Sequence, residues 1–287
     1  MQRLVEGTLV LGQVCQINPQ DIAVALPNNL MGYAHLTRIS GPLTKTVESI
    51  IDEDNHSEDK DDRTIPSPKD LFMLGQWVRV AVIENTVVSG ASDKLSKKKH
   101  VELSLEPELV NAPLSPDDIL SGTLVQVSVS SIEDHGLIVS LGLPGLTGFV
   151  KLASLGSYNV DDIKEGQVFL ASVERTPTNN VVQLSLDLKA SQKVIDDVSD
   201  IRSLLPGDKV RCLVSEVRAA GIGGKVLGML NAIIDQFHLG GADIQENSNV
   251  ILFIISLIQA HCTDNCFLSF RGYPQGLVVN SATYSGA

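Results

Sequence analysis

The chain has 287 residues, of which 43% are hydrophobic and 20% are charged, and its formal net charge is −12. This composition supplies enough apolar side chains to build folded cores and excludes a disordered chain. The negative charge argues against strong RNA binding by this chain alone, because Lys and Arg side chains that neutralise phosphates supply most non-specific affinity.

One order of short motifs recurs three times along the chain. Each copy opens on a Gly-led segment of alternating apolar residues and closes on LSL or LSF. The opening segments are 7–17, 122–132 and 207–217, and the closing ones are 103–105, 184–186 and 268–270. Because each copy of an internal repeat is one supersecondary unit, we predict three domains: copy one (1–111), copy two (112–190) and copy three (191–287).

Copy one carries strand signals and two insertions. Period-two apolar spacing predicts strands over 7–17, 22–26, 31–39 and 74–84, with a fifth at the LSL motif. An inserted stretch, about 41–70, contains the acidic run 53–62, which has no apolar period and is expected to be a solvated, mobile loop. A second insertion, 87–99, ends in Lys97, Lys98 and Lys99, which form either a soluble hairpin tip or phosphate contacts.

The later copies repeat the strand pattern. The predicted strands are 122–132, 137–141, 147–155, 165–174 and 184–186 in copy two, and 207–217, 225–230, 231–239, 246–257 and 268–270 in copy three. The Gly-rich segment 221–230 reads as a loose connection that leads into a strand. Segments 107–118 and 189–200 read as linkers, with a short helix as an alternative for the second.

Five short strands in each copy, with one longer connection between the third and the fourth, fit a small OB-type Greek-key barrel better than a sandwich. The predicted fold class is therefore all-β, a tandem array of three five-stranded OB-type barrels.

Several functional classes lack a sequence signal. The longest apolar run, 250–258, is too short to cross a bilayer as a helix, so no membrane partner is expected. Four scattered cysteines indicate a reducing compartment and buried thiols, and the His261, Cys262 and Cys266 group lacks a second ligand pair for zinc. Without a recognised catalytic or phosphate-loop motif, we expect no enzyme activity, no cofactor and no small-molecule substrate.

These motifs resemble a known domain family. The Gly-led first and fourth strands, the G-aromatic-V-His/Lys pattern of the third strand and the closing LSL resemble the S-one RNA-binding domain. Segments such as GYAHLTRIS and SSIEDHGLIVSLGLPGLTGFV are similar to the opening repeats of the RRP-five (programmed cell death protein eleven) family of rRNA biogenesis proteins. The resemblance implies a nucleolar role in pre-rRNA processing and ribosomal subunit assembly. It also implies that pre-rRNA, ribosomal proteins and assembly proteins are partners.

The resemblance places an RNA-binding face on the second and third strands, where exposed aromatics stack on bases. The family's third-strand histidine falls on His35, Lys151 and Asp235 in the three copies. The RNA-binding candidates are Tyr33, His35, Arg38, His100, His135, Phe149 and Lys151. For each aromatic the alternative is a core or barrel-rim position, for His35 and His135 a solvated imidazole, and for Arg38 an exposed turn.

Two functions stay open at this stage. The first is a non-catalytic array that binds pre-rRNA through weak modules linked in series. The second is a scaffold that mainly docks assembly proteins, with RNA binding located outside these residues. Copy three, whose candidate stacking positions are aliphatic and which carries Asp235, is expected to have kept the barrel and lost the RNA face.

Overall fold

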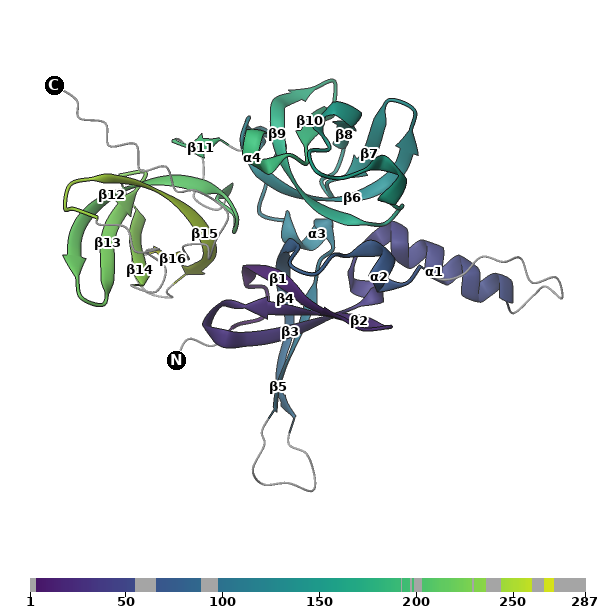
Figure 1. The fold of residues 1–287 in the computed structure, drawn as a ribbon, viewed down its shortest axis with the longest axis horizontal. Coiled ribbons are helices and arrows are strands. Elements are labelled where there is room, and N and C mark those ends of the chain that lie inside the picture. Colours follow the sequence, from purple (N-terminus) through teal and green to yellow (C-terminus); the bar gives the residue numbers. More distant parts are fainter. Residues whose placement is uncertain are drawn as a thin grey trace. The chain divides into compact units, whose positions relative to one another are not determined.

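The computed structural model describes residues 4–54, 66–88, 98–191, 193–196, 198, 203–228, 230–235, 244–259 and 266–270. The chain forms two compact units, Met1–Ser191 and Gln192–Ala287. Most described elements are strands (Figure 1), and the first unit contains two closed five-stranded barrels. The all-β prediction is confirmed to this extent.

The first barrel is built by copy one. Its strands are β1 (Leu9–Ile17), β2 (Asp21–Leu26), β3 (Leu30–His35), β4 (Trp77–Val88) and β5 (Lys98–Ser104). They pair in the cyclic order β1–β2–β3–β5–β4–β1, and only the β3–β5 pair is parallel. Because side chains alternate across a strand, Val10, Val14, Ile22 and Val24 point inward and pack with Leu103.

The second barrel repeats this order in copy two. Its strands are β6 (Leu124–Glu133), β7 (Gly136–Ser140), β8 (Thr147–Lys151), β9 (Val168–Thr178) and β10 (Val181–Ser185). They close in the order β10–β8–β7–β6–β9. Val125, Val127, Leu137, Val150 and Leu184 are almost completely buried along these strands.

Copy three forms the second unit. Its elements are β11 (Val194–Ile195), β12 (Lys209–Arg218), β13 (Gly221–Val226), β14 (Leu230–Asp235), β15 (Asn249–Gln259) and β16 (Cys266–Phe270). The pairings β12–β13, β13–β14, β14–β16, β15–β16 and β12–β15 follow the order seen in the other copies. Val210, Cys212, Val214, Ile222 and Ile254 belong to its buried core.

The second strand of copy three begins earlier than predicted. Segment 221–230 was assigned to a connection followed by a strand at 225–230, whereas β13 spans Gly221–Val226. Gly221 begins this strand as Gly136 begins β7, and both have positive φ values, of 146° and 157°. Gly223 and Gly224 have no side chains to show the period-two alternation, so the apolar pattern pointed to the residues that follow.

The third strands of copies one and two end sooner than the predicted 31–39 and 147–155, and residues 236–239 of the predicted strand 231–239 lie outside the described part of the chain. β3 ends at His35 and β8 at Lys151, and single 3-10 turns follow at Leu36–Arg38 and Leu152–Ser154. At the first turn the His35 side chain accepts a hydrogen bond from the backbone N–H of Thr37. This cap begins the turn and stops the strand.

Part of the predicted loop of copy one is a helix. α1 spans Gly41–Asp54, which includes the first two residues of the acidic run, and the short helix α2 spans Pro68–Leu71. Leu43 and Val47 of α1 are buried in the core of copy one. Their spacing of four residues places both on one face of the helix. Residues 55–65 lie outside the described part of the chain.

The predicted linker 107–118 is not a loose tether. It contains the helix α3 (Pro107–Val110) and then Asn111, which is completely buried. The Asn111 amide nitrogen donates to the carbonyls of Gln126 (2.6 Å) and Leu141 (2.8 Å), and its oxygen accepts from the backbone N–H of Gln126 (3.2 Å). The segment is therefore fixed to the second barrel.

A buried polar network joins copies one and two. Arg79 of β4 and Gln126 of β6 are both completely buried, and the backbone of Arg79 is hydrogen-bonded to the side-chain amide of Gln126. The Arg79 N–H donates to Gln126 Oε1, and Gln126 Nε2 donates to the Arg79 carbonyl, both at 2.8 Å. The Arg79 guanidinium also donates to Asn111 Oδ1 (3.3 Å) and to the Leu124 carbonyl (2.9 Å).

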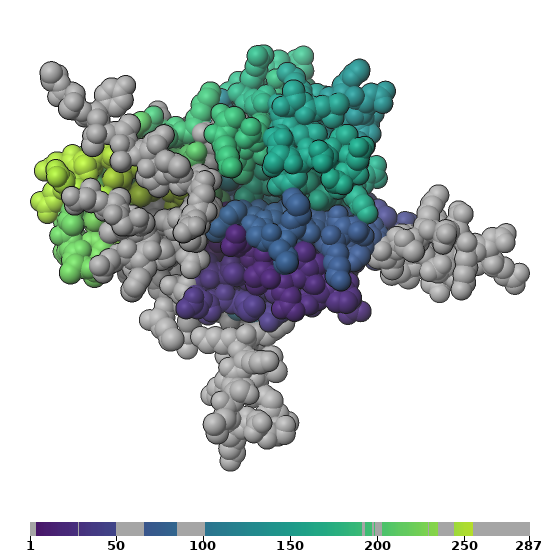
Figure 2. All heavy atoms as spheres, viewed as in Figure 1, coloured from purple at the N-terminus to yellow at the C-terminus, as the bar shows by residue number. Residues whose placement is uncertain are grey.

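Apolar contacts surround this network. Leu11 of copy one packs with Leu124 and Leu170 of copy two, and the partly buried Trp77 and Leu188 cover the cluster. At the start of α1, the Ser40 hydroxyl donates to the Gly166 carbonyl at 2.7 Å. Figure 2 shows copy one (purple to blue) in continuous contact with copy two (teal). The two barrels thus form one compact unit.

The short helix α4 (Leu188–Ser191) ends the first unit and overlaps the start of segment 189–200, which the sequence assigned to a linker or a short helix. None of the helices in the described ranges has the length and apolarity needed to cross a membrane.

Candidate nucleic-acid interface

Strand register identifies equivalent positions in the three copies. The last residue of the third strand pairs with the first residue of the second strand in every copy: His35 with Asp21, Lys151 with Gly136 and Asp235 with Gly221. The residue two positions earlier on the third strand pairs with one residue of the second strand and one residue of the fifth strand, and that fifth-strand residue pairs with one of the fourth strand. We call these four paired residues, one from each of these strands, the cross-strand row.

The cross-strand row has a different chemistry in each copy. It consists of Ala23, Tyr33, Glu102 and Glu84 in copy one, Ile138, Phe149, Gln183 and Arg175 in copy two, and Gly223, Ile233, Ser269 and Ser256 in copy three. Directly opposite residues share one face of a sheet and lie close together. The row therefore combines an aromatic with two acids in copy one, an aromatic with an amide and a cation in copy two, and an aliphatic residue with two serines in copy three.

In copy two the aromatic ring lies over a glycine. Phe149 is half-buried, and a Cβ on Gly136 would lie 2.9 Å from Phe149 Cζ and 2.2 Å from the carbonyl oxygen of Val150. Only glycine fits there without moving the ring or the strand. The ring keeps part of its surface open beside Ile138, which is also half-buried.

Exposed basic side chains flank this ring. Lys151 ends the same strand, Arg175 ends the cross-strand row, and His135 precedes the glycine; all three are exposed. Gln183 lies between Phe149 and Arg175, and its Oε1 is buried with no hydrogen-bond partner among the described residues. Glu174, the neighbour of Arg175 on β9, accepts a hydrogen bond from the Ser154 hydroxyl at 2.8 Å.

Copy one presents an acidic version of the face. Tyr33 is half-buried, and its row continues through Glu102 to the exposed Glu84. His35 is exposed, and its Nδ1 lies 3.0 Å from the Thr37 hydroxyl. Two carboxylates beside the ring would repel a phosphate backbone.

The remaining candidates of copy one are only partly placed. The Arg38 side chain is exposed, while its backbone carbonyl accepts from the Leu105 N–H at 2.8 Å. Lys98, Lys99 and His100 belong to β5, opposite Val88, Val87 and Thr86 of β4, but their side chains lie outside the described structure. Lys97 lies outside the described residues altogether.

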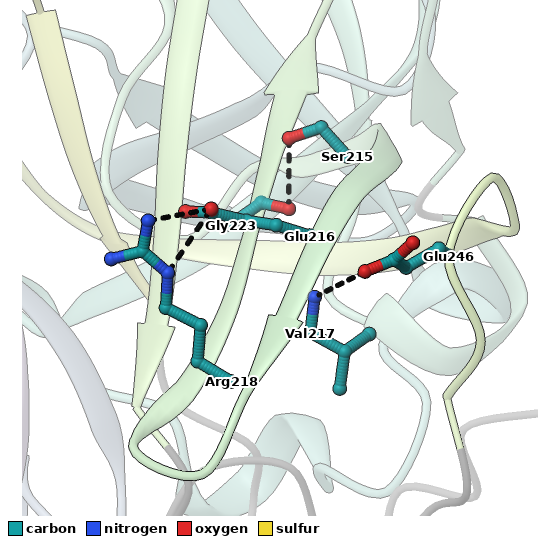
Figure 3. A network of polar contacts seen from close by, with 6 residues as sticks. All are labelled: Ser215, Glu216, Val217, Arg218, Gly223 and Glu246. Carbon is teal, nitrogen blue, oxygen red and sulfur yellow. Dashed lines mark hydrogen bonds and ion pairs between the residues drawn. The ribbon is translucent and has the colours of Figure 1, made fainter.

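Copy three has neither the ring nor the exposed cations at these positions. Ile233, at the position of Tyr33 and Phe149, is 56% exposed, and Asp235 takes the position of Lys151. Figure 3 shows that the nearby guanidinium of Arg218 binds Glu216, with Nη2 and Nε at 2.7 and 3.0 Å from Oε2. In the same view Ser215 donates to the Gly223 carbonyl and Val217 N–H to Glu246.

Two residues of the copy-two face were missed from the sequence. The fourth strand was predicted to end at residue 174, but β9 continues to Thr178 and includes Arg175. Irregular register in the β9–β10 pair places Arg175 opposite Gln183. The motif pattern contains no signal for such a bulge, so only the observed pairing could bring these residues together.

The cysteines differ in environment. Cys15 is exposed, contrary to the expectation of buried thiols, and its Sγ donates to the Ala23 carbonyl. Cys212 is buried, and burial raises the pKa of its thiol to about 11. Within the described ranges no three His, Cys, Asp or Glu side chains gather as a metal site would require.

Comparison with known sequences finds relatives named rRNA biogenesis protein RRP5 or RRP5 homolog. The chain is 34% identical over 277 residues to the rRNA biogenesis protein rrp5 of Schizosaccharomyces pombe, covering 88% of the chain and 15% of that protein. It is 30% identical over 248 residues to the human protein RRP5 homolog, covering 83% of the chain and 13% of the relative. The Arabidopsis thaliana rRNA biogenesis protein RRP5 is 30% identical over 237 residues, 81% of the chain and 11% of the relative.

The chain thus spans less than a fifth of the length of these relatives. No protein-family model matches it.

Solved structures give weaker matches. A complex of a/eIF2alpha, aDim2p and rRNA from Pyrococcus horikoshii is 32% identical over 23% of this chain and 43% of its own, with a TM-score of 0.22. A multidomain protein with nucleic acid binding domains from Streptococcus pneumoniae is 10% identical over 96% of this chain and 77% of its own, with a TM-score of 0.21.

Proposed function

Because this chain belongs to the RRP5 family of rRNA biogenesis proteins, we propose that it acts without catalysis in pre-rRNA processing and ribosomal subunit assembly. In this role it binds single-stranded pre-rRNA weakly and also contacts ribosomal and assembly proteins. The site of action is the nucleolus. The proposal divides the chain into the three predicted domains, and the strand pairings of copy three support a third barrel of the same type.

One observation carries the RNA-binding part of the proposal, namely the face of copy two. Phe149 offers a half-buried ring for stacking, and Lys151 and Arg175 are exposed on either side of it. Base stacking on an aromatic side chain contributes about 1 to 3 kcal/mol and tolerates any base, while cations follow the backbone. This combination suits a single strand of RNA and no particular sequence.

The other copies limit the affinity. Glu84 and Glu102 beside Tyr33 oppose the phosphate backbone in copy one, and the whole chain is acidic. Each barrel is therefore expected to bind RNA weakly or not at all by itself, and useful affinity arises from linkage to further binding modules.

A scaffold function is the second candidate, and copy three favours it. Ile233 and Asp235 occupy the positions where copy two carries Phe149 and Lys151. An exposed aliphatic residue beside an acid suits contact with a protein surface better than contact with RNA.

Fluorescence anisotropy with a labelled U-rich single-stranded RNA separates the two functions. Phe149→Ala is expected to weaken binding by about 5- to 150-fold, the equivalent of one lost stacking contact. The matched control, Ile233→Ala at the same position of copy three, should leave binding unchanged. Absence of binding by the wild-type chain at low salt, or a Phe149→Ala variant that binds as tightly as the wild type, would leave the scaffold function as the better account.

A further inference from the structure

The barrels of copies one and two join through equivalent surfaces. The surface is the outer face of the first and fourth strands, centred on one pair of directly opposite residues in each copy. These pairs are Leu11 with Arg79, Gln126 with Leu170, and Arg211 with Ile251 in copies one, two and three. We call this surface the joining face.

Contact between copies one and two is like against like. Arg79 and Gln126, one from each central pair, exchange two hydrogen bonds of 2.8 Å. Leu11 and Leu170, the other members of the two pairs, lie in one apolar cluster. Equal surfaces that face each other in this way have the form of an isologous, two-fold contact.

In copy three the joining face is exposed. Leu213 is 48% exposed and Ile251 is 38% exposed, whereas the equivalent residues of copy two, Ser128 and Leu170, are 0% and 7% exposed. Phe253, two residues beyond Ile251, is partly buried beneath the Lys209 ammonium, which lies 5.3 Å from the ring centroid. At the position of Ile251, copy two uses Leu170 to bind another barrel, and copy three adds the apolar side chains of Leu213 and Phe253 to this face.

The charges on this face are compatible with a self-complementary contact. The Arg211 guanidinium lies 3.1 Å from Asp196 Oδ1, so its charge has a partner within the same copy. The other outward residues are Lys209, whose ammonium lies over the Phe253 ring, and Asn249, which is neutral and pairs with Leu213. Both cations of the face thus have a contact within the same copy, and two such faces can approach without bringing unpaired carboxylates together.

We infer that the joining face of copy three docks against the same face of a second copy of this chain, forming a two-fold dimer. Ile251 lies at the centre of the contact, as Leu170 does between copies one and two. The inference does not depend on RNA binding, because the joining face and the cross-strand row share only the fourth strand and have no residue in common.

Analytical ultracentrifugation of the full 287-residue chain without RNA tests the inference. A species of twice the 30.8 kDa chain mass should appear as the protein concentration rises. Ile251→Glu and Leu213→Glu should each weaken the dimer by at least about 100-fold. One tenfold loss corresponds to about 1.4 kcal/mol, and the two-fold axis places each substitution in the contact twice.

Ile233→Glu is the matched control, since Ile233 is more exposed than either residue and lies outside the joining face. It should leave the dimer intact, and circular dichroism should show all three variants folded. A chain that stays monomeric at every concentration overturns the inference. So does a dimer that survives both joining-face substitutions, or one that Ile233→Glu disrupts.

Discussion

At the end of the third strand, copy two carries Phe149 and Lys151 where copy three carries Ile233 and Asp235. On the joining face, copy two buries Gln126 and Leu170 where copy three exposes Arg211 and Ile251. The pairing pattern is the same in both, so backbone geometry does not set these differences. Barrels with the same strand order therefore differ in the side chains of two outward surfaces, the one around the cross-strand row and the joining face.

Substitution of Arg79 tests the buried contact between copies one and two. Arg79→Met should lower the free energy of unfolding of the first unit by about 2 to 5 kcal/mol, because Asn111 Oδ1 and the Leu124 carbonyl lose a buried donor. Urea denaturation followed by the fluorescence of Trp77, the single tryptophan and part of the junction cluster, measures the loss.

Arg211→Met is the control on the joining face of copy three, where Arg211 lies directly opposite Ile251, the residue at the position of Arg79. The Arg211 side chain is 50% exposed and binds an exposed Asp196, so its removal should change stability by less than about 1 kcal/mol. Equal losses in the two variants would contradict the view that only copies one and two bury this surface within the chain.

The strands and their order could largely be predicted from the sequence, because a Gly-led segment with period-two apolar spacing forms a strand that buries its apolar face in the barrel core. Strand existence and order in copies one and two therefore agree with the prediction. The alternation could not be seen at β13, because glycines have no side chains. The helix α1 was not predicted, because its buried Leu43 and Val47 lie in an insertion that was assigned mainly from its acidic run.

The candidate site was less accessible to sequence reasoning. Phe149, Lys151 and His135 stand in motifs and could be named in advance, whereas Arg175 and Gln183 join the face through the irregular β9–β10 register. Arg79, Asn111 and Gln126 could not be identified either, since polar residues on strands and in linkers normally face water. Only the packing of one barrel on the other buries them.

The glycine beneath the copy-two ring provides a second way to sharpen the comparison. Gly136→Ala should cost about 2 to 4 kcal/mol, because the new Cβ meets the Val150 carbonyl at 2.2 Å and the Phe149 ring at 2.9 Å. Gly145→Ala, at another positive φ in copy two with nothing within 4 Å, should cost only about 1 kcal/mol of backbone strain. Thermal unfolding of the two variants measures the difference, and similar losses would show that the ring does not rest on Gly136.

The smallest expected effect concerns single charges. Lys151→Gln and Arg175→Gln should each reduce the slope of log affinity for single-stranded RNA against log salt by about 0.7, the value for one lost phosphate contact. Arg218→Gln in copy three should leave the slope unchanged, because Glu216 already binds that guanidinium at 2.7 Å and the pair offers RNA no net charge. Anisotropy titrations at several salt concentrations measure all three slopes. An Arg218 effect equal to that of Lys151 would place RNA on copy three as well, and the division of labour between the two copies would then be wrong.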